Sequence, residues 1–137
     1  MTTSRADDTE IAQTLSEWAR AFAAGNVAAA LALITPDAEF WTQGAAPLVG
    51  HEAVAQALGA FFGRFRAVQQ FTELERFVGT DWVLLRGEER NTLTPKDGSA
   101  SIEHRQRAFS LLRRGPDGRW RFARGMTNQG PATYEAK

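Results

Sequence analysis

Residues 22–40 read FAAGNVAAALALITPDAEF, and this stretch decides how the N-terminal half of the chain folds. Gly25 can take the left-handed backbone conformation that ends a helix, and Asn26 can cap the helix that follows. Pro36 is expected to stop this second, short helix. Its apolar side is formed by Val27, Leu31 and Ile34. The stretch therefore predicts an αα-hairpin, two helices joined by a tight turn.

Upstream of this turn, apolar residues recur at intervals of three or four and so share one helix face. They are Ile11, Leu15, Trp18, Ala19 and Phe22. Asp7 and Glu10 have the spacing of a capping box, with Asp in place of Ser or Thr. The pattern predicts a first helix from Asp7 to Gly25.

Downstream, residues 37–42 lie between turn-forming residues and predict a short strand. The helical spacing returns after Gly50 and predicts a third helix. Its apolar positions are Val54, Leu58, Phe61, Phe62 and Phe65. Gly59 and Gly63 lower the helix propensity of this segment, and we expect them to allow close packing against a neighbour.

The C-terminal half predicts an antiparallel meander. Residues 82–94, 101–114 and 119–128 are strand-like segments separated by two turns rich in Pro, Asp and Gly. Residues 68–78 fit a helical period at least as well as a strand period, so the local pattern leaves them open. Residues 130–137 are a short polar tail that we expect to be loosely ordered.

The composition limits the class of protein. A chain of 137 residues with 43% hydrophobic and 23% charged residues is typical of one globular domain, here residues 1–137. The 16 basic residues balance the 16 acidic ones, which leaves no net field to attract a polyanion. Neither nucleic acid nor a membrane surface is expected as a partner.

Residue types and segments that the chain lacks limit the class of protein further. The chain has no cysteine, which excludes disulfides, thiolate catalysis and Cys-ligated zinc. With only two histidines as well, neither a metal nor another cofactor is expected. The first ten residues are polar, and no later segment resembles a membrane span, so we expect a cytoplasmic protein.

The order helix, short helix, strand, helix and long meander resembles the nuclear transport factor 2-like superfamily, which includes ketosteroid isomerases and SnoaL-type polyketide cyclases. Residues 22–31 and 35–40 look like the superfamily signature of the first two helices, and residues 48–54 look like the start of its third helix. Residues 109–114 and 118–122 resemble the paired last strands of SnoaL-like and SgcJ/EcaC-like members.

This resemblance implies an α+β fold in which a cone-shaped, curved antiparallel sheet wraps around three N-terminal helices, as in cystatin-like folds. It also implies that residues 68–78 form a strand. The expected ligand is a small, largely apolar molecule held in a hydrophobic cavity.

Ketosteroid isomerases use a carboxylate base together with a Tyr and a protonated Asp as hydrogen-bond donors. The resemblance places Trp18 at the Tyr position, Thr42 at the base and Ser110 at the second donor. Because none of these side chains can replace the original group, steroid-type proton transfer by this constellation is not expected.

His104 is the candidate catalytic residue, because imidazole suits proton transfer near neutral pH and SnoaL-type cyclases are implied to use a pocket His or Asp. The alternative is a histidine at the rim or in solvent. Thr127 and Asn128 end the last strand and either bind a ligand or meet water. The candidate pocket residues are Trp18, Phe22, Phe40, Thr42, Phe62, Gln106, Ser110, Thr127 and Asn128.

Charged residues alternate along two neighbouring predicted strands and predict an exposed cross-strand ladder of ion pairs. They are Arg86, Glu88, Arg90, Glu103, Arg105 and Arg107. The alternative is an Arg–carboxylate pair that activates water inside the cavity, as in limonene-epoxide-hydrolase-like relatives. That chemistry needs a second carboxylate, which residues 119–129 lack.

Both faces of the last two predicted strands carry apolar groups, and only one face can cover the helices. We therefore expect a homodimer through the outer sheet face. For function, we expect an isomerase, cyclase or dehydratase that acts on a polyketide-like or other carbonyl compound. The alternative is a non-catalytic ligand-binding or protein-association module.

Overall fold

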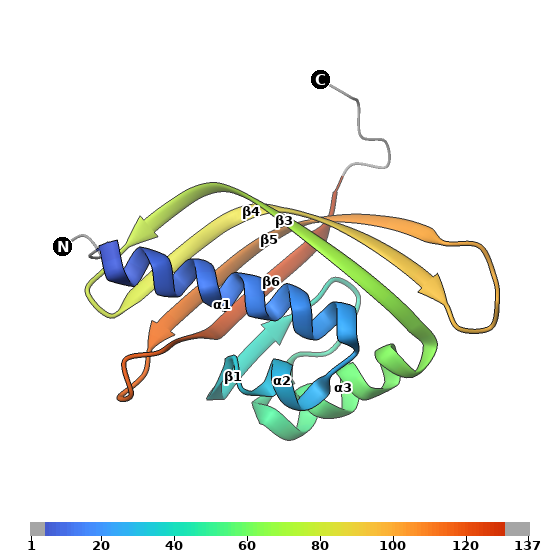
Figure 1. Ribbon diagram of the computed structural model, residues 1–137, viewed down its shortest axis with the longest axis horizontal. Helices are drawn as coiled ribbons and strands as arrows, with labels where there is room; N and C mark the ends of the chain where they lie inside the picture. Colours follow the sequence, from blue (N-terminus) through green and yellow to red (C-terminus); the bar gives the residue numbers. More distant parts are fainter. Residues whose placement is uncertain (1–4, 131–137) are drawn as a thin grey trace.

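The computed structural model describes residues 5–130. In chain order its elements are α1 Arg5–Ala24, α2 Val27–Leu31, β1 Ile34–Trp41, β2 Leu48–Val49, α3 Gly50–Arg64, β3 Phe65–Val78, β4 Trp82–Pro95, β5 Ile102–Arg114 and β6 Trp120–Gln129. The strands form one six-stranded sheet in the order β2-β1-β6-β5-β4-β3. Figure 1 shows this sheet strongly curved, with α1 lying across one face and α2 and α3 gathered beside β1. The expected α+β fold, a curved sheet around three N-terminal helices, is confirmed.

The turn between the first two helices forms as predicted. Gly25 has a φ of +62° and ends α1, and the side-chain oxygen of Asn26 accepts a hydrogen bond from the backbone N–H of Ala29 at 3.0 Å. The predicted end of the second helix is wrong, since Ile34 and Pro36 both belong to β1. The ladder from β1 to β6 is interrupted between Ile34 and Glu39, so the missing N–H of Pro36 costs no ladder hydrogen bond.

Pairing between strands departs from the prediction in two places. The meander β3-β4-β5-β6 is antiparallel, as expected, but β1 runs parallel to β6. The two-residue strand β2, which pairs with β1, was not predicted. Residues 68–78 do form a strand, and it begins earlier, at Phe65. The predicted tail falls on residues 131–137, outside the described part of the chain.

The two glycines of α3 do not mark close packing, so that prediction is wrong. A Cβ built on either Gly59 or Gly63 would meet no atom within 4 Å. Both glycines are exposed. Close approaches occur instead in the sheet: a Cβ at Gly125 would lie 2.7 Å from the ring of Phe40, so Phe40 crosses β6 where a larger residue would block it.

The core lies between the helices and the concave face of the sheet. Its largest fully buried side chains come from α1 and four strands, and each contributes roughly 1.5 to 3 kcal/mol through removal of apolar surface from water. They are Trp120, Ile11, Ile34, Leu85, Leu112 and Val83. This core fixes α1 over the sheet.

Asp7 does not cap the first helix, which begins at Arg5. Asp7 is 8% exposed, and its side chain forms an ion pair with Arg114 at 3.0 Å. The indole N–H of Trp120 also donates to Asp7, at 3.4 Å. The Arg114 guanidinium lies 4.9 Å from the centre of the Trp120 ring. Asp7 therefore joins the start of α1 to β5 and β6.

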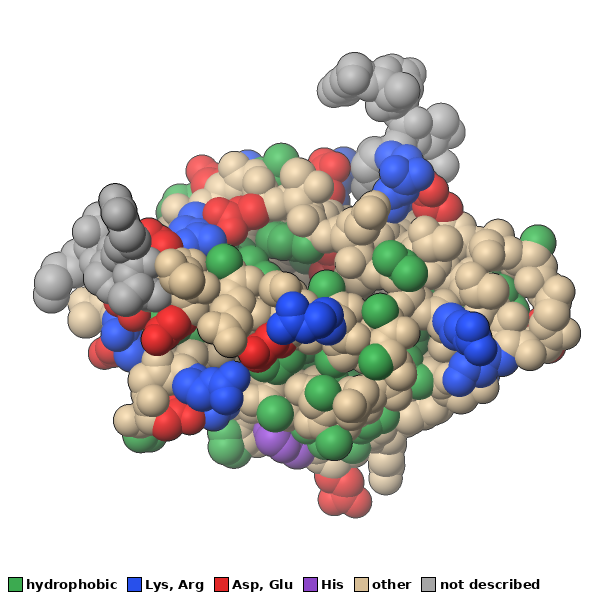
Figure 2. Space-filling view, in the orientation of Figure 1, with side chains coloured by type: hydrophobic (Ala, Val, Ile, Leu, Met, Phe, Trp, Pro, Cys, Tyr) green, Lys and Arg blue, Asp and Glu red, His purple; other side chains and the backbone are tan. Residues whose placement is uncertain are grey.

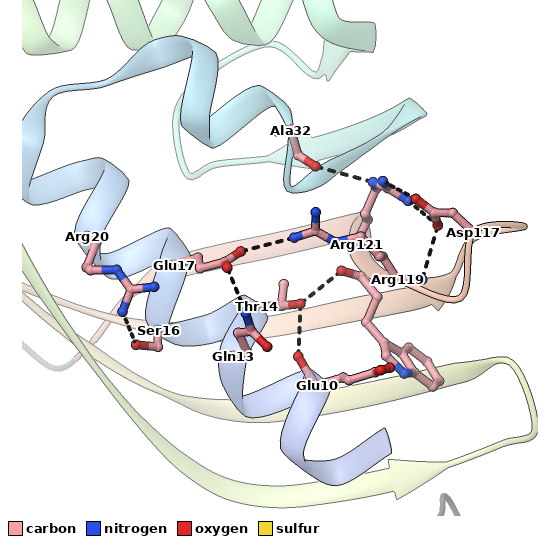
Figure 3. Close-up of polar contacts among 11 residues, drawn as sticks. Glu10, Gln13, Thr14, Ser16, Glu17, Arg20, Ala32, Asp117, Arg119 and Arg121 are labelled. Carbon is pink, nitrogen blue, oxygen red and sulfur yellow. Dashed lines mark hydrogen bonds and ion pairs between the residues drawn. The ribbon is translucent and has the colours of Figure 1, made fainter. Parts of the chain in front are cut away.

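Further polar contacts fasten the β5–β6 turn to α1 and α2 (Figure 3). The hydroxyl of Thr14 donates to the backbone carbonyl of Trp120 at 2.9 Å. Arg119 donates to Glu17 at 3.3 Å, and Arg121 donates to the backbone carbonyl that follows α2 at 3.2 Å. These contacts hold one end of the sheet against the helices and leave the other end free to diverge from them.

Candidate functional site

A cavity of about 450 Å³ lies between the helices and the concave face of the sheet. Figure 2 shows the surface hollowed beside α1. Most of the lining is apolar and comes from α1, α3 and the strands, including Leu15, Phe22, Val54, Leu58, Leu85 and Phe122. This size falls within the range of roughly 300 to 1,000 Å³ that small-molecule sites occupy.

The structure brings most of the candidate pocket residues to this cavity. Those in its lining are Trp18, Phe22, Phe40, Thr42, Gln106, Ser110 and Thr127. Phe62 lies elsewhere: it is 5% exposed and packs edge-on against Phe22, with ring centres 5.1 Å apart. Phe62 therefore supports the cavity wall from behind.

Asn128 faces the opposite side of the sheet, where it lines an outer groove. Neighbouring residues of a strand point to opposite faces, and of this pair only Thr127 is part of the cavity lining. The hydroxyl oxygen of Thr127 is buried and has no hydrogen-bond partner among residues 5–130.

A polar centre interrupts the apolar lining, and Glu89 of β4 is its carboxyl group. Glu89 lies between Gln69 of β3 and Gln106 of β5. Its Oε1 accepts hydrogen bonds from the Gln106 side-chain amide at 2.5 Å and from the Gln69 side-chain amide at 3.3 Å. The three side chains therefore form a hydrogen-bonded row across three strands.

Trp18 fixes the orientation of this row. Its indole N–H donates to Oε1 of Gln69 at 2.9 Å. Because an indole N–H can only donate, the Gln69 amide must present its oxygen to Trp18 and its NH₂ group to Glu89. An aromatic side chain of α1 thus determines which groups surround a carboxyl on β4.

Burial raises the pKa of Glu89, while hydrogen bonds from Gln106 and Asn91 and the nearby charge of His104 lower it; burial prevails. None of the ion pairs formed within residues 5–130 includes Glu89. A carboxyl of this kind can hold its proton closer to neutral pH than an exposed one. It can then donate a hydrogen bond or exchange a proton.

His104, the candidate catalytic residue, does not contribute to the cavity lining. It pairs with Asn91 across the β4–β5 ladder and acts on Glu89 through its charge. His104 is partly buried. It therefore lies beyond the cavity lining, on the same face of β5 as Gln106.

The sequence analysis missed Glu89, although a signal was present. On β4 the alternating positions Val83, Leu85, Gly87, Glu89 and Asn91 share the concave face. This face begins with apolar residues and therefore packs against the core. A carboxyl and an amide that follow on the same face are a sign of a polar site inside the protein. The sequence analysis considered only the charged residues on the other face of β4, which predict an exposed ladder.

That ladder lies on the outer face. Arg90 and Glu103 are 2.9 Å apart, Arg105 and Glu103 are 2.8 Å apart, and Arg86 pairs with Glu75 of β3 at 3.0 Å. None of the charged residues predicted for the ladder lines the cavity. The alternative of an Arg–carboxylate pair inside the cavity gains no support from this arrangement.

The outer face also carries hydrophobic side chains, which we call the outer apolar patch. It consists of Trp41, Leu74, Leu84, Phe109, Leu111 and Met126. Several are well exposed, among them Trp41 at 52%, Met126 at 49% and Phe109 at 40%. They line a groove of about 530 Å³ and a second hollow beside it.

The described residues offer neither a metal site nor a membrane-spanning helix. Within residues 5–130, no group of three or more His, Cys, Asp or Glu side chains is positioned to hold a metal ion. His51 instead places its Nε2 3.2 Å from the backbone carbonyl oxygen of Ile34. None of the described helices has the length and apolar character needed to cross a membrane.

The family model described as a SnoaL-like domain matches residues 15–131. A search of curated proteins found no match.

Among solved structures, a conserved protein from Planctomyces limnophilus is 26% identical, with a TM-score of 0.85, covering 93% of this chain and 99% of that one. A ketosteroid isomerase-like protein from Erwinia carotovora is 22% identical, with a TM-score of 0.77 and coverage of 88% and 94%. A candidate dehydratase of the NTF2-like family from Streptomyces avermitilis is 18% identical, with a TM-score of 0.77 and coverage of 95% and 100%.

Proposed function

The chain belongs to the SnoaL-like domain family, and from this premise we propose that its cavity binds a small, largely apolar carbonyl compound and supports proton transfer of the isomerase, cyclase or dehydratase type. The observation that carries this proposal is an apolar cavity of about 450 Å³ with one polar centre. An apolar wall with few, well-placed polar groups is the usual composition of a small-molecule site.

Proton transfer needs a titratable group at the cavity surface, and Glu89 is such a group. His104 takes part in this proposal through Glu89, because its charge favours the ionised carboxyl. In this proposal Glu89 alone touches the ligand, and His104 acts on it through its charge. The candidate dehydratase from Streptomyces avermitilis, which shares the fold, is consistent with this class of reaction.

A thermal-shift screen against polycyclic ketones, aromatic polyketide fragments and epoxides tests the binding. A ligand present at about 100 times its dissociation constant should add roughly 2.7 kcal/mol to the free energy of unfolding. Hits are then tested for turnover with wild type and with His104→Ala.

A cavity-filling variant provides the control for location. Ser110→Phe places a ring in the cavity lining and should abolish the thermal shift, whereas Ser101→Phe, at an exposed position, should leave it unchanged. No stabilisation by any compound, or an equal shift in Ser110→Phe, would contradict the proposal.

The outer apolar patch favours a second role, association with another copy of this chain. Exposed hydrophobic surface of this kind on a sheet face commonly marks an interface. A homodimer through this face would remove Trp41, Phe109 and Met126 from water. Trp41 and Met126 also line the rim of the cavity, whose polar centre lies on the concave face.

Light scattering at micromolar concentration tests the homodimer. Phe109→Glu should dissociate it, because the charge would be buried in the interface. Ile102→Glu makes the same change at an exposed apolar residue outside the patch, 50% exposed, and should not affect the mass. A monomeric wild-type protein would refute the dimer.

A further inference from the structure

The charges in the cavity lining restrict what can bind there. Two carboxyl groups, those of Glu73 and Glu89, contribute to the lining, and no Lys, Arg or His does so among the described residues. Glu73 is compensated from outside the cavity by Arg76, at 2.9 Å. Glu89 has only neutral amides within hydrogen-bond distance. An anionic ligand would therefore find no positive partner and one uncompensated carboxyl.

The hydrogen bonds of Glu89 also decide which of its oxygens can carry a proton. Both glutamine amides donate to Oε1. An oxygen that accepts two N–H groups is a poor position for a proton, so the proton of the acid form belongs on Oε2. In the acid form Oε1 therefore accepts from both glutamine amides and the O–H lies on Oε2, while Asn91 supplies a further hydrogen bond to the carboxyl.

We propose that Glu89 is a ligand-selecting hydrogen-bond donor, which presents its O–H to the carbonyl oxygen of a neutral ligand and makes the cavity reject carboxylates and phosphates. This inference rests on the proposed function, since it specifies the charge class of the ligand in the same cavity. Glu89 is not one of the positions that align with the functional residues of ketosteroid isomerases, which are Trp18, Thr42 and Ser110.

The groups that face Glu89 are consistent with this assignment. On β3 the titratable residue of the cavity lining is Glu73, which forms an ion pair with Arg76. From β5 it is His104, which favours the ionised form of Glu89 but does not overcome burial. The residues of α1 and α3 that line the cavity carry no titratable side chain. The acid form is thus opposed by the hydrogen bonds from Gln106 and Asn91 and by the charge of His104, and burial outweighs all three.

Three probes of one shape and different charge test the selection: α-tetralone, tetralin carboxylate and aminotetralin. Their affinities are measured by calorimetry at about pH 5 and about pH 9, on either side of the range expected for a buried Glu. Wild type should bind α-tetralone roughly tenfold more tightly at the lower pH, because ionisation of Glu89 removes the donor. Tetralin carboxylate should not bind.

Two variants separate hydrogen bonding from shape. Glu89→Gln retains an N–H donor that never ionises, so its affinity for α-tetralone should be the same at both pH values. Glu89→Leu lacks the donor and should bind roughly tenfold more weakly at about pH 5. Equal binding of the carboxylate and the ketone, a preference for aminotetralin over the ketone at about pH 5, or a pH-independent affinity in wild type would overturn the inference.

A ligand-free measurement keeps the two proposals distinguishable. If wild type binds none of the probes, the proposed function is contradicted, and carboxyl-carbon NMR of the free protein decides the state of Glu89. A titration midpoint above the ordinary range of Glu supports a donor at this position. A midpoint within or below that range overturns the inference.

Discussion

Asp7 and Glu89 are both acidic residues withdrawn from water, and the protein surrounds them with opposite kinds of partner. Asp7 meets the guanidinium of Arg114 at 3.0 Å and the indole of Trp120 at 3.4 Å. Glu89 meets two neutral amides and faces a cavity of about 450 Å³. One carboxyl has a full counter-charge, and the other has none within hydrogen-bond distance.

The difference distinguishes a structural acid from a candidate functional one. A buried carboxylate paired with a partly buried guanidinium is fixed in charge and position, so it fastens elements together. A carboxyl that keeps only neutral donors can change its protonation state without disrupting an ion pair. Its charge can then respond to a ligand or to pH.

Breaking the ion pair between Asp7 and Arg114 should have the largest effect on the free energy of unfolding. Asp7→Ala leaves the Arg114 guanidinium partly buried without its principal partner, and we expect a loss of about 3 kcal/mol in the free energy of unfolding. Urea denaturation measures this loss. As a control, Asp37→Asn removes an exposed carboxylate that pairs with Arg113 and Arg124, and it should cost less than about 1 kcal/mol. Equal losses in the two variants would show that Asp7 is not structural.

Removing a hydrogen bond from the polar centre should have an intermediate effect on the free energy of unfolding. Trp18→Phe removes the donor that orients Gln69 and leaves an amide oxygen unpaired, at a cost of about 1 to 2 kcal/mol. The same substitution at Trp82, which is 46% exposed, should change stability by less than about 0.5 kcal/mol. Thermal denaturation compares the two. A negligible loss in Trp18→Phe would mean that Gln69 is held by other groups.

Removing the charge of His104 should have the smallest effect on stability, and we expect it to be detected as a change in the pKa of Glu89. The charge of His104 lowers the pKa of Glu89, so His104→Gln should raise that pKa where the histidine is protonated. Carboxyl-carbon NMR titration detects the shift. His51→Gln, on α3, removes the other histidine and should leave the Glu89 titration unchanged. A pKa that falls in His104→Gln would contradict the proposed coupling.

Local signals were sufficient for much of the fold. Gly25 and Asn26 determine the turn between α1 and α2 through backbone conformation and capping, which depend on a few neighbouring residues. The resemblance of the chain to a known superfamily resolved β3, where the hydrophobic period alone could not. The parallel pairing of β1 with β6 joins segments far apart in sequence, and no local pattern encodes it.

The candidate site was less accessible from sequence. Aromatic and polar residues such as Trp18, Gln106 and Ser110 were placed at the cavity by superfamily resemblance and strand alternation. Asn128 was misplaced because the same alternation was not applied to its neighbour Thr127. Glu89 was overlooked because its environment depends on Gln69 and Trp18, whose positions beside it follow from sheet register and helix docking.

The pH dependence of stability in Glu89→Gln relative to wild type tests the central claim most directly. Burial raises the folded-state pKa of Glu89, so the protonated form stabilises wild type at low pH, and this contribution is lost as pH rises through the folded-state pKa. The variant never ionises at this position. Its free energy of unfolding should therefore increase relative to wild type from the ordinary Glu pKa upward, and the difference should be constant below it. A difference that does not change with pH, or that changes in the opposite direction, would contradict an uncompensated carboxyl in the cavity.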